Sequence, residues 1–344
     1  MSFPAAGTEK TRSIRHRQKF KGHTGLVFGV IHLRGGQRII TCSDDGSLRV
    51  WNLESGKQIG GNWRDGKSGV LTMALSPDGK KIVSGSRDGW VRFWNIDTGK
   101  LIIRWMAHID IITSVCWSRD GGRVVTGSLD RTVRVWNVES RETILEIKIH
   151  LLSVNWRPAA IYSADETMIA TATHFIKIWD AKTGKLIEVL EGHQGEETCV
   201  AWTADGSKLI SGSFEPSIRI WNTTTWQKIH VLTGHTNMVD AIAISPNGRI
   251  LASASQDKTA RLWNLDNGQP IGLPLQHAGL VACVSFSADG KLLASGGGPT
   301  DNSAYTWDIS AIVREAGLDE LLLNSGVSIQ FLMSLHNSTL NASS

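Results

Sequence analysis

Histidine, serine and aspartate recur along this chain at fixed distances from a tryptophan, and these three are the residue types of a hydrolytic triad. In one unit, His23, Ser43 and Asp45 lie 28, eight and six residues before Trp51. The same types stand at the same distances from later tryptophans, at Ser86, Asp88, Trp94, His108, Ser128, Asp130, Trp136, His193, Ser213, Trp221, His235, Ser255, Asp257 and Trp263. An enzyme needs one such site, and no G-x-S-x-G nucleophile elbow accompanies these residues. The repetition therefore predicts a structural hydrogen-bond network and a chain that is not an enzyme.

Metal-binding and nucleotide-binding patterns do not occur in the sequence. The 11 histidines show neither an H-E-x-x-H motif nor a paired Cys/His spacing, which are the usual signs of zinc sites. We therefore expect no metal and no cofactor. The four cysteines are too far apart to form a C-x-x-C pair, and we interpret them as buried small hydrophobic residues in a reducing compartment: Cys42, Cys116, Cys199 and Cys283.

The formal charge of +4 is concentrated at the N-terminus. Residues 1–21 carry six Lys and Arg residues against Glu9 alone, a balance of +5, so the remaining chain sums to −1. A neutral body argues against a basic groove for nucleic acid. The basic segment leaves one alternative open: a nucleic-acid- or chromatin-associated protein that binds through its N-terminus, with an affinity that falls as salt rises.

Composition and local patterns also bear on location. The chain is 41% hydrophobic and 20% charged, and it contains no apolar run long enough to span a bilayer. Its first residues lack the charged-then-apolar order of a secretory signal. These features predict a cytoplasmic or nuclear protein without membrane attachment.

The elements that must position the recurrent residues come from one repeated unit. Seven tryptophans follow one another at intervals of 42 to 44 residues: Trp51, Trp94, Trp136, Trp179, Trp221, Trp263 and Trp307. Within one unit, apolar and polar residues alternate over 238–245, 249–255 and 259–265, which predicts three strands separated by turn residues. A fourth strand is predicted over 269–275. Units of about 40–45 residues with four strands are typical of propeller blades.

On these residues and spacings the chain resembles the WD-repeat family from Ser13 to Trp307, and it is similar to cytosolic WD arrays, including those of fungal signalling proteins. The resemblance implies an all-β fold, a seven-bladed β-propeller of four-stranded antiparallel blades in which the recurrent side chains hydrogen-bond to one another. It also implies that an N-terminal strand over 13–20 completes the last blade. The domains expected are an N-terminal tail (1–12), the propeller (13–308), a short helical extension (309–323) and a disordered tail (324–344).

Several units depart from the repeated pattern. Blade two has Gly66 at the histidine position, and blade five has Glu215 at the aspartate position. Blade four has Ser153 at the histidine position and no aspartate after Thr173, while blade seven has a two-residue insertion near Asp301. We therefore expect blades four and seven to be the loosest.

In WD propellers, partners usually bind the narrow face around the central channel. Carried over by position, this implies a partner-binding set at Leu26, Phe28, Asp44, Arg87, Ile111, Leu129, Trp156, Glu196, Phe214, Met238, Asp240, Gln256 and Leu280. The set is more apolar than exposed loop edges normally are, which favours a binding surface over the alternative that these side chains merely pack the turns.

The arrangement of this set predicts the chemistry of its ligand. Phe28, Phe214 and Met238 are expected to lie on one arc that acidic residues border, with Arg87 on the far arc. A ligand that pairs an apolar anchor with Lys or Arg would suit such an arc. The predicted function is a scaffold or recognition module for a protein or peptide, acting as a monomer or as a subunit of a larger complex.

Overall fold

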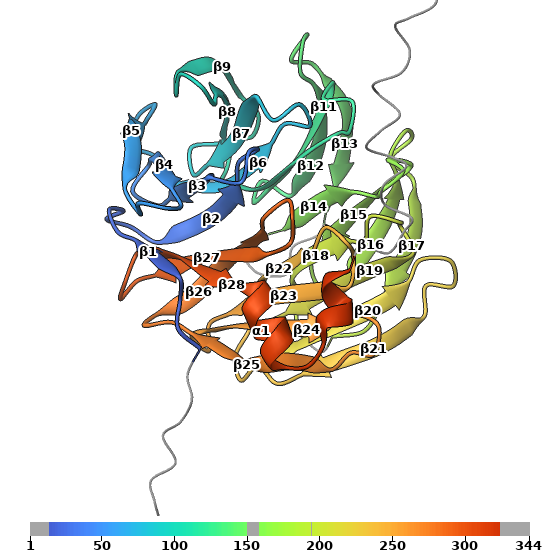
Figure 1. Cartoon of the computed structure of the whole chain (residues 1–344). Coiled ribbons are helices and arrows are strands. Elements are labelled where there is room, and N and C mark those ends of the chain that lie inside the picture. The colour runs from blue at the N-terminus through green and yellow to red at the C-terminus, as the bar shows by residue number, and fades with distance from the viewer. Residues whose placement is uncertain (1–13, 150–157, 194, 324–344) are drawn as a thin grey trace, which may run out of the picture.

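The computed structural model describes residues 14–149, 158–193 and 195–323. Their strands form seven four-stranded antiparallel sheets arranged as blades around a central axis (Figure 1). Blades one to three consist of β2 (Val27–His32), β3 (Arg38–Ser43), β4 (Leu48–Asn52), β5 (Gln58–Trp63), β6 (Val70–Leu75), β7 (Lys81–Ser86), β8 (Trp90–Asn95), β9 (Leu101–Met106), β10 (Ile112–Trp117), β11 (Arg123–Ser128), β12 (Thr132–Asn137) and β13 (Thr143–Lys148). Blades four to six consist of β14 (Ala159–Tyr162), β15 (Met168–Ala172), β16 (Ile176–Asp180), β17 (Leu186–Leu190), β18 (Glu197–Trp202), β19 (Lys208–Ser213), β20 (Ser217–Asn222), β21 (Lys228–Thr233), β22 (Val239–Ile244), β23 (Ile250–Ser255), β24 (Thr259–Asn264) and β25 (Pro270–Gln276). Blade seven consists of β26 (Leu280–Phe286), β27 (Leu292–Gly298), β28 (Ala304–Asp308) and β1 (Gln18–Phe20).

Short hairpins join the strands of a blade in sequence order. In the hairpin after β22, Ser245 Oγ lies 2.7 Å from Asn247 Oδ1. Gly248 follows with φ of +73°, a left-handed conformation that glycine adopts without a Cβ clash. Because successive strands are antiparallel, the first and third strands of every blade end on the same face of the ring. The first strands begin on the opposite face, which we call the rim face.

The core lies between adjacent blades, and the repeated tryptophans form much of it. Trp263 of blade six is 1% exposed and belongs to the same apolar cluster as Ile210 and Ile220 of blade five. Trp307 of blade seven is likewise buried in a cluster with Leu262 of blade six. Each blade thus buries its apolar surface against its neighbour, which is how repeated units with little core of their own become stable.

The ring is closed by the N-terminal strand, as the sequence predicted. β1 pairs with β28 in the antiparallel register Gln18 to Thr306, Lys19 to Tyr305 and Phe20 to Ala304. The strand is shorter than the predicted 13–20, although the Arg17 amide also donates to Thr306 O at 2.7 Å. The seven-bladed fold with its last blade completed by the N-terminus is therefore confirmed.

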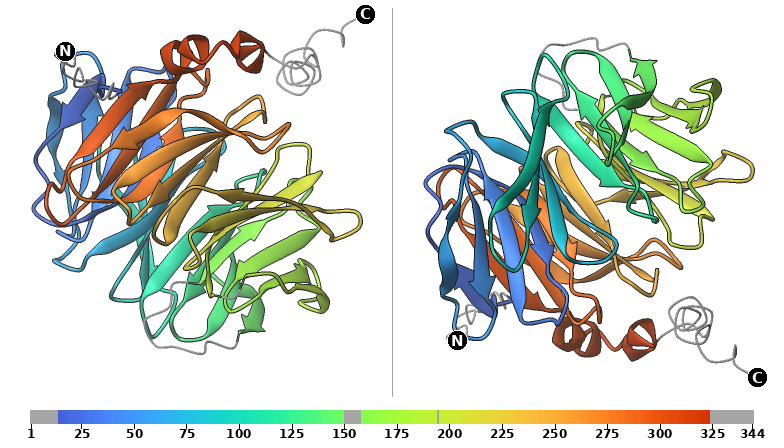
Figure 2. Two further views of the ribbon diagram at one scale, coloured as in Figure 1. Left: turned by 90° about the horizontal axis from the view of Figure 1, so that it is seen from below. Right: turned by 90° about the horizontal axis from the view of Figure 1, so that it is seen from above.

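A short helix follows the last blade, also as predicted. α1 (Ile309–Glu315) begins at Asp308, whose side chain accepts a hydrogen bond from the Ala311 amide, and a 3₁₀ turn, η1 (Asp319–Leu322), follows it. Ile312 and Val313 are buried against blades six and seven. Figure 2 shows both elements on the outside of the ring of blades. The expected tails, 1–12 and 324–344, lie outside the described residues.

Candidate partner-binding face and its supporting network

The polar network of blade six shows what the repeated side chains do. His235 Nδ1 lies 2.7 Å from Asp257 Oδ2, and His235 Nε2 lies 2.7 Å from Ser253 Oγ. Trp263 Nε1 donates to the same Ser253 Oγ at 2.8 Å. Blades one and three repeat this chain of contacts with a threonine in place of the serine. The network ties the segment before the first strand to the second and third strands of the blade.

The hydroxyl in this network differs from the one that the sequence indicated. Ser43 was expected in it, but Ser43 Oγ donates to Gly25 O and accepts a hydrogen bond from the Asp45 amide. Ser43 ends β3, so its hydroxyl bonds to the adjoining turn; Ser86, Ser128, Ser213 and Ser255 end their strands in the same way. The hydroxyls that accept from the indoles lie ten residues before the tryptophan, at Thr41, Ser84, Thr126, Ser211 and Ser253. That regular spacing was the signal available in the sequence.

Burial and hydrogen bonding act in opposite directions on the network carboxylates. Burial alone would raise the pKa of Asp130, but hydrogen bonds from His108 and Thr132 outweigh it and lower the pKa to about 2. The same balance holds the pKa values of Asp45 and Asp257 below their usual range. These carboxylates are therefore ionised near neutral pH, and since a carboxylate only accepts, Nδ1 of the facing histidine carries the proton.

Blade two replaces the missing histidine with a buried arginine. Arg92 is 5% exposed, and it donates to Asp88 at 2.7 and 3.0 Å and to Asp65 at 2.8 Å. Its Nη1 also donates to Ser86 Oγ at 3.1 Å. The sequence identified Gly66 as the departure but did not identify its replacement, because the guanidinium comes from the third strand and not from the histidine position.

Blade five has a longer version of the network. His193 Nδ1 lies 3.2 Å from Glu215 Oε2, and His193 Nε2 lies 3.2 Å from Ser211 Oγ. Trp221 Nε1 also donates to Ser211 Oγ at 3.2 Å. The side chain of Glu215 is 33% exposed, compared with 3% for Asp257 in blade six. The additional methylene of glutamate thus places the carboxylate nearer to solvent.

Blade seven keeps a network that its insertion concealed in the sequence. His277 Nε2 lies 3.1 Å from Ser295 Oγ, and Trp307 Nε1 donates to the same oxygen at 2.8 Å. His277 was missed because the insertion places it 30 residues before the tryptophan. Lys19 of the closing strand donates to Asp301 at 2.7 Å. These contacts give no support to the expectation that blade seven is loose.

In blade four, the described part of the network is a single bond. Trp179 Nε1 donates to Thr171 Oγ1 at 2.9 Å. After Thr173, the turn closes within two residues, since the Thr173 amide donates to Phe175 O at 3.2 Å. Ser153, at the histidine position, lies outside the described residues.

The described residues among those expected to contact a partner lie on the rim face, and their exposure differs. Phe214 is 49% exposed, and Asp44 and Arg87 are also exposed. The half-buried members of the set are Leu26, Phe28, Ile111, Leu129, Glu196, Met238, Asp240, Gln256 and Leu280. Trp156 lies outside the described residues.

Two charged residues of the expected partner-binding set bind each other. Arg87 Nε donates to Asp44 Oδ1 at 2.7 Å. The placement of Arg87 on an arc far from Asp44 is therefore wrong: blades one and two are neighbours, and their turns meet across the boundary. The other acidic members of the expected set are Glu196 and Asp240, on blades five and six.

The central channel opens among these residues. It forms a cavity of about 540 Å³ between the first strands of the blades. The second residue of several first strands lines it near the rim face, namely Phe28, Leu71, Thr113, Thr198 and Asp240. Among the described lining residues, Asp240 is the one with a formal charge at neutral pH. A single carboxylate in an otherwise uncharged lining favours a cationic group at the channel mouth.

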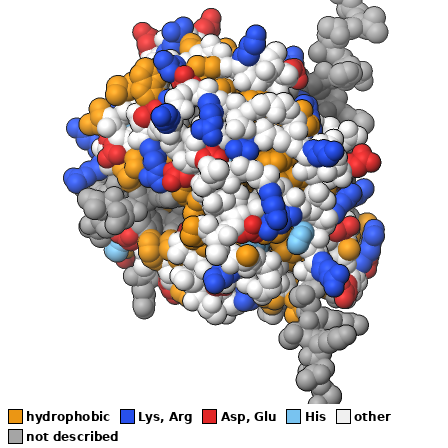
Figure 3. Space-filling view, turned by 90° about the vertical axis from the view of Figure 1, so that its left-hand side faces the viewer, with side chains coloured by type: hydrophobic (Ala, Val, Ile, Leu, Met, Phe, Trp, Pro, Cys, Tyr) orange, Lys and Arg blue, Asp and Glu red, His pale blue; other side chains and the backbone are white. Residues whose placement is uncertain are grey.

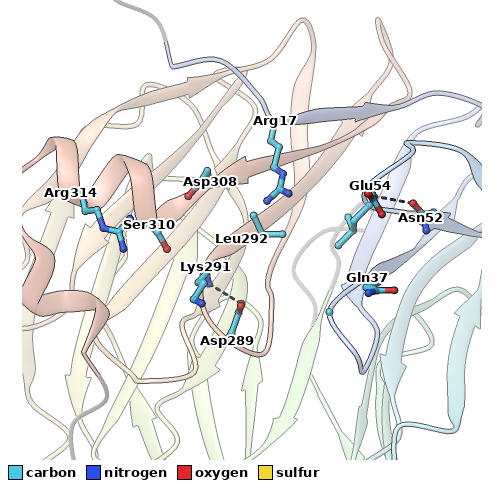
Figure 4. Close-up of a pocket in the computed structure, with 12 residues that line it drawn as sticks. Arg17, Gln37, Asn52, Glu54, Asp289, Lys291, Leu292, Asp308, Ser310 and Arg314 are labelled. Atoms are coloured by element: carbon cyan, nitrogen blue, oxygen red, sulfur yellow. Dashed lines mark hydrogen bonds between the residues drawn. The ribbon is translucent and has the colours of Figure 1, made fainter.

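A second cavity, of about 610 Å³, lies where blade seven meets blade one (Figure 4). Side chains of both signs line it: Arg17, Lys291, Arg314, Glu54, Asp289 and Asp308. Asp308 caps α1, and Asp289 Oδ1 accepts hydrogen bonds from Ser287 Oγ and the Lys291 amide. Because its charges are mixed and partly engaged in the local fold, this cavity does not select a ligand by charge.

The described ranges carry no sign of a metal site or of a membrane-spanning helix, and the side of them seen in Figure 3 carries no sign of a basic nucleic-acid surface. These ranges contain no group of three His, Cys, Asp or Glu residues placed to hold a metal ion. None of the helices within them is long and apolar enough to cross a membrane. On the side seen in Figure 3, Lys and Arg side chains are interspersed with Asp and Glu. The described residues of that side therefore form no continuous basic field of the kind that phosphate backbones require.

Known proteins share the repeated unit. The profile of the family described as WD domain, G-beta repeat matches more than half of the chain, at residues 14–52, 59–95, 99–137, 184–222, 226–264 and 268–308. The largest unmatched interval contains β14, β15 and β16 of blade four, where the repeated residues are replaced. Angio-associated migratory cell protein from Homo sapiens, Pongo abelii and Canis lupus familiaris is 54% identical over 43 residues, 12% of this chain. The matched stretch spans 10% of the length of those relatives, so the likeness concerns about one blade.

Proposed function

The chain belongs to the WD-repeat family, whose propellers generally serve as protein-interaction modules, and we propose that it is a non-catalytic scaffold holding a peptide or protein partner on its rim face. The histidine, hydroxyl and carboxylate groups that resemble a triad recur from blade to blade and are engaged in the fold. A repeated and buried network supports a structural role for these groups.

The observation that carries the proposal is an exposed aromatic side chain on the rim, Phe214. Phe214 occupies the turn of blade five, and Met238 lies three residues after the histidine of blade six. The equivalent positions in blades one and two are Asp44 and Gly69, and a Cβ at Gly69 would lie 2.3 Å from Asp44 Oδ1. From this equivalence we infer that Phe214 and Met238 lie on facing sides of the boundary between their blades. Aromatic anchors in such positions often supply most of the binding energy of an interface.

Charge around this pair favours a basic partner. Glu196 lies on the same blade as Phe214, and Phe214 N donates to Glu196 O at 3.0 Å. Asp240 lies two residues after Met238 and faces the channel. A peptide that inserts an apolar side chain between Phe214 and Met238 and directs Lys or Arg towards these acids would match the site in both respects.

Phe28 contributes differently from the other aromatic residue of the predicted arc. It is half-buried, lines the channel and packs against the core that blades one and two share. Replacing it would therefore disturb the blades as well as the rim. Phe214 and Met238 are the better positions for testing binding.

The experiment is affinity capture with quantitative mass spectrometry, using the full chain and its Phe214→Ala and Met238→Ala double variant. The matched control is Ile229→Ala, because Ile229 lies on the outer strand of the same blade and is 41% exposed. We expect the double variant to lose its partner, at roughly 2–4 kcal/mol per hot-spot residue in later calorimetry, while the control retains it. Full retention by the double variant would place the binding site elsewhere. Recovery of nucleic acid that is lost at moderate salt would support the nucleic-acid alternative.

A further inference from the structure

The first strand of blade five begins with a buried acid where its counterparts carry apolar residues. Glu197 lies four residues after His193 and is 1% exposed. The equivalent positions of five other blades are occupied by Val27, Val70, Ile112, Val239 and Val281, all 0–3% exposed. A carboxyl group thus stands at a point of the fold where these five described blades carry branched apolar side chains.

The surroundings of Glu197 leave part of this carboxyl group unsatisfied. Among the described residues, Glu197 Oε2 has no hydrogen-bond partner, and it lies 3.6 Å from His193 Nε2. The Glu197 amide donates to Thr173 O of blade four at 2.7 Å, so the acid begins its strand at the boundary between the two blades. The titratable or charged groups that act on this pair are Glu215, Arg219 and Lys228 in blade five. The elements packed against it also carry Cys199 and Lys208 in blade five, His174 in blade four and Asp240 in blade six.

Burial dominates the protonation of both groups. It raises the pKa of Glu197 well above its usual range, and the smaller opposing effects of Ser211 and Arg219 do not cancel it. Burial, followed by the charge of Arg219, lowers the pKa of His193 to about 4. Both side chains are therefore neutral in the closed blade over an interval of pH. Ionising either one there places a charge away from water, and local opening relieves that cost.

We propose that Glu197 and His193 form a proton-linked latch at the boundary of blades four and five, which opens locally when Glu197 loses its proton. The boundary is suited to opening because β14, the first strand of blade four, has four residues, whereas the first strands of the other blades have six or seven. On the other side, the His193 contacts are 3.2 Å long, whereas those of His235 are 2.7 Å. The latch does not depend on the proposed binding function.

The direction of the pH effect follows from linkage. The open blade releases the Glu197 proton near the ordinary pKa of 4.5, whereas the closed blade retains it. Closure therefore weakens as pH rises from about that value through the raised pKa, by up to tenfold in the closed-to-open ratio per pH unit. His193 acts at the acidic end of the pH range, because its lowered pKa weakens closure as pH falls from 6.5 towards about 4.

The test is hydrogen exchange with mass spectrometry on the full chain between pH 5.5 and 9. Protection of residues 197–213 is compared with that of 239–255 in blade six of the same molecule, so that the intrinsic pH dependence of exchange largely cancels. In the natural chain, we expect the relative protection of 197–213 to fall by at least tenfold across the range. Glu197→Gln should abolish the slope, and Glu196→Gln, which removes the neighbouring half-buried carboxylate, should leave it unchanged.

The latch would be overturned by a natural chain without the slope or by a Glu197→Gln variant that retains it. Glu197→Leu provides a second variant with the apolar character of the other blades, and it should show the same loss of slope. If Glu196→Gln removed the slope as well, the effect would belong to the surface charge of the rim and not to the buried acid.

Discussion

Blade six and blade five present a histidine at the same point of the fold, and their acids meet it in different ways. In blade six, Asp257 is 3% exposed and lies 2.7 Å from His235. In blade five, Glu215 is 33% exposed and lies 3.2 Å from His193, and Glu197 adds a second acid that is fully buried. The comparison teaches that the repeat sets the positions of the side chains. The length of the acidic side chain and the number of acids set how closely the histidine is bound.

Blade two shows a third arrangement at the same point. Arg92 carries a permanent charge, so the turn carboxylate of Asp88 is held by an ion pair with a guanidinium in place of a histidine. Asp65 provides a second carboxylate at 2.8 Å. The three blades therefore predict three distinct responses to mutation and pH, which the following measurements separate.

The largest effect is expected for Arg92→Ala in blade two. Removing this buried guanidinium leaves Asp65 and Asp88 without their shared partner, and breaking a buried ion pair costs about 3–5 kcal/mol. Arg104→Ala is the matched control, because Arg104 binds the same Asp65 but is 47% exposed, and it should cost below about 1 kcal/mol. Urea unfolding followed by tryptophan fluorescence measures both. Similar losses for the two variants would show that burial of Arg92 is unimportant.

A smaller effect is expected for Asp257→Ala in blade six. The substitution leaves the buried His235 without its acceptor, at a cost of about 1–3 kcal/mol in the free energy of unfolding. Glu215→Ala in blade five should cost less, because its carboxylate is partly solvated and its contact with His193 is longer. A loss at Glu215 equal to or above that at Asp257 would contradict the distinction between the two blades.

The pH dependence of blade three should have the opposite sign to that of the blade five latch. The pKa of Asp130 is lowered to about 2 in the fold, from an ordinary value of 3.8. The stability that this ionised group contributes is therefore present above about pH 4 and is lost as pH falls towards 2. Asp130→Asn should flatten the decline by about 1–2 kcal/mol between these values. Unfolding free energies at several acidic pH values measure this, and an unchanged decline would assign acid sensitivity to other groups.

The smallest effect is expected for Asp44→Asn on the rim. Asp44 and Arg87 form an exposed pair, with side chains 37% and 42% accessible, and such pairs contribute at most about 1 kcal/mol. The loss should shrink further as salt is raised, because exposed charges are screened. A larger loss that is insensitive to salt would mean that this pair supports the boundary between blades one and two.

The sequence indicated the architecture because its signals are local and repeated. The interval between tryptophans, the alternation within strands and the turn residues all describe one unit, and seven copies predict a closed ring. Closure by the N-terminal strand was expected from the resemblance to the WD-repeat family. The histidine positions of blades one, three, five and six followed from the same fixed spacing.

Contacts between strands and between blades could not be predicted from these local, repeated signals. Whether Thr41 or Ser43 meets the indole depends on the register of β3 with β4, in which Trp51 pairs with Ile39 and Thr41 pairs with Arg49, and on Ser43 ending the strand at the turn. Arg92 takes the place of histidine because the third strand brings its guanidinium to two carboxylates that are distant in sequence.

The sequence by itself determined the number of blades and their order, because periodicity and alternation are properties of the chain. The face on which a partner is expected came from the resemblance to WD propellers. The tertiary structure decided which rim charges are engaged, which aromatic residue is exposed, and that Glu197 is buried. Each of these three features depends on which residues the neighbouring blade places within a few ångströms. At that distance, loss of water and pairing with a neighbour determine the free energy of a charged or aromatic side chain.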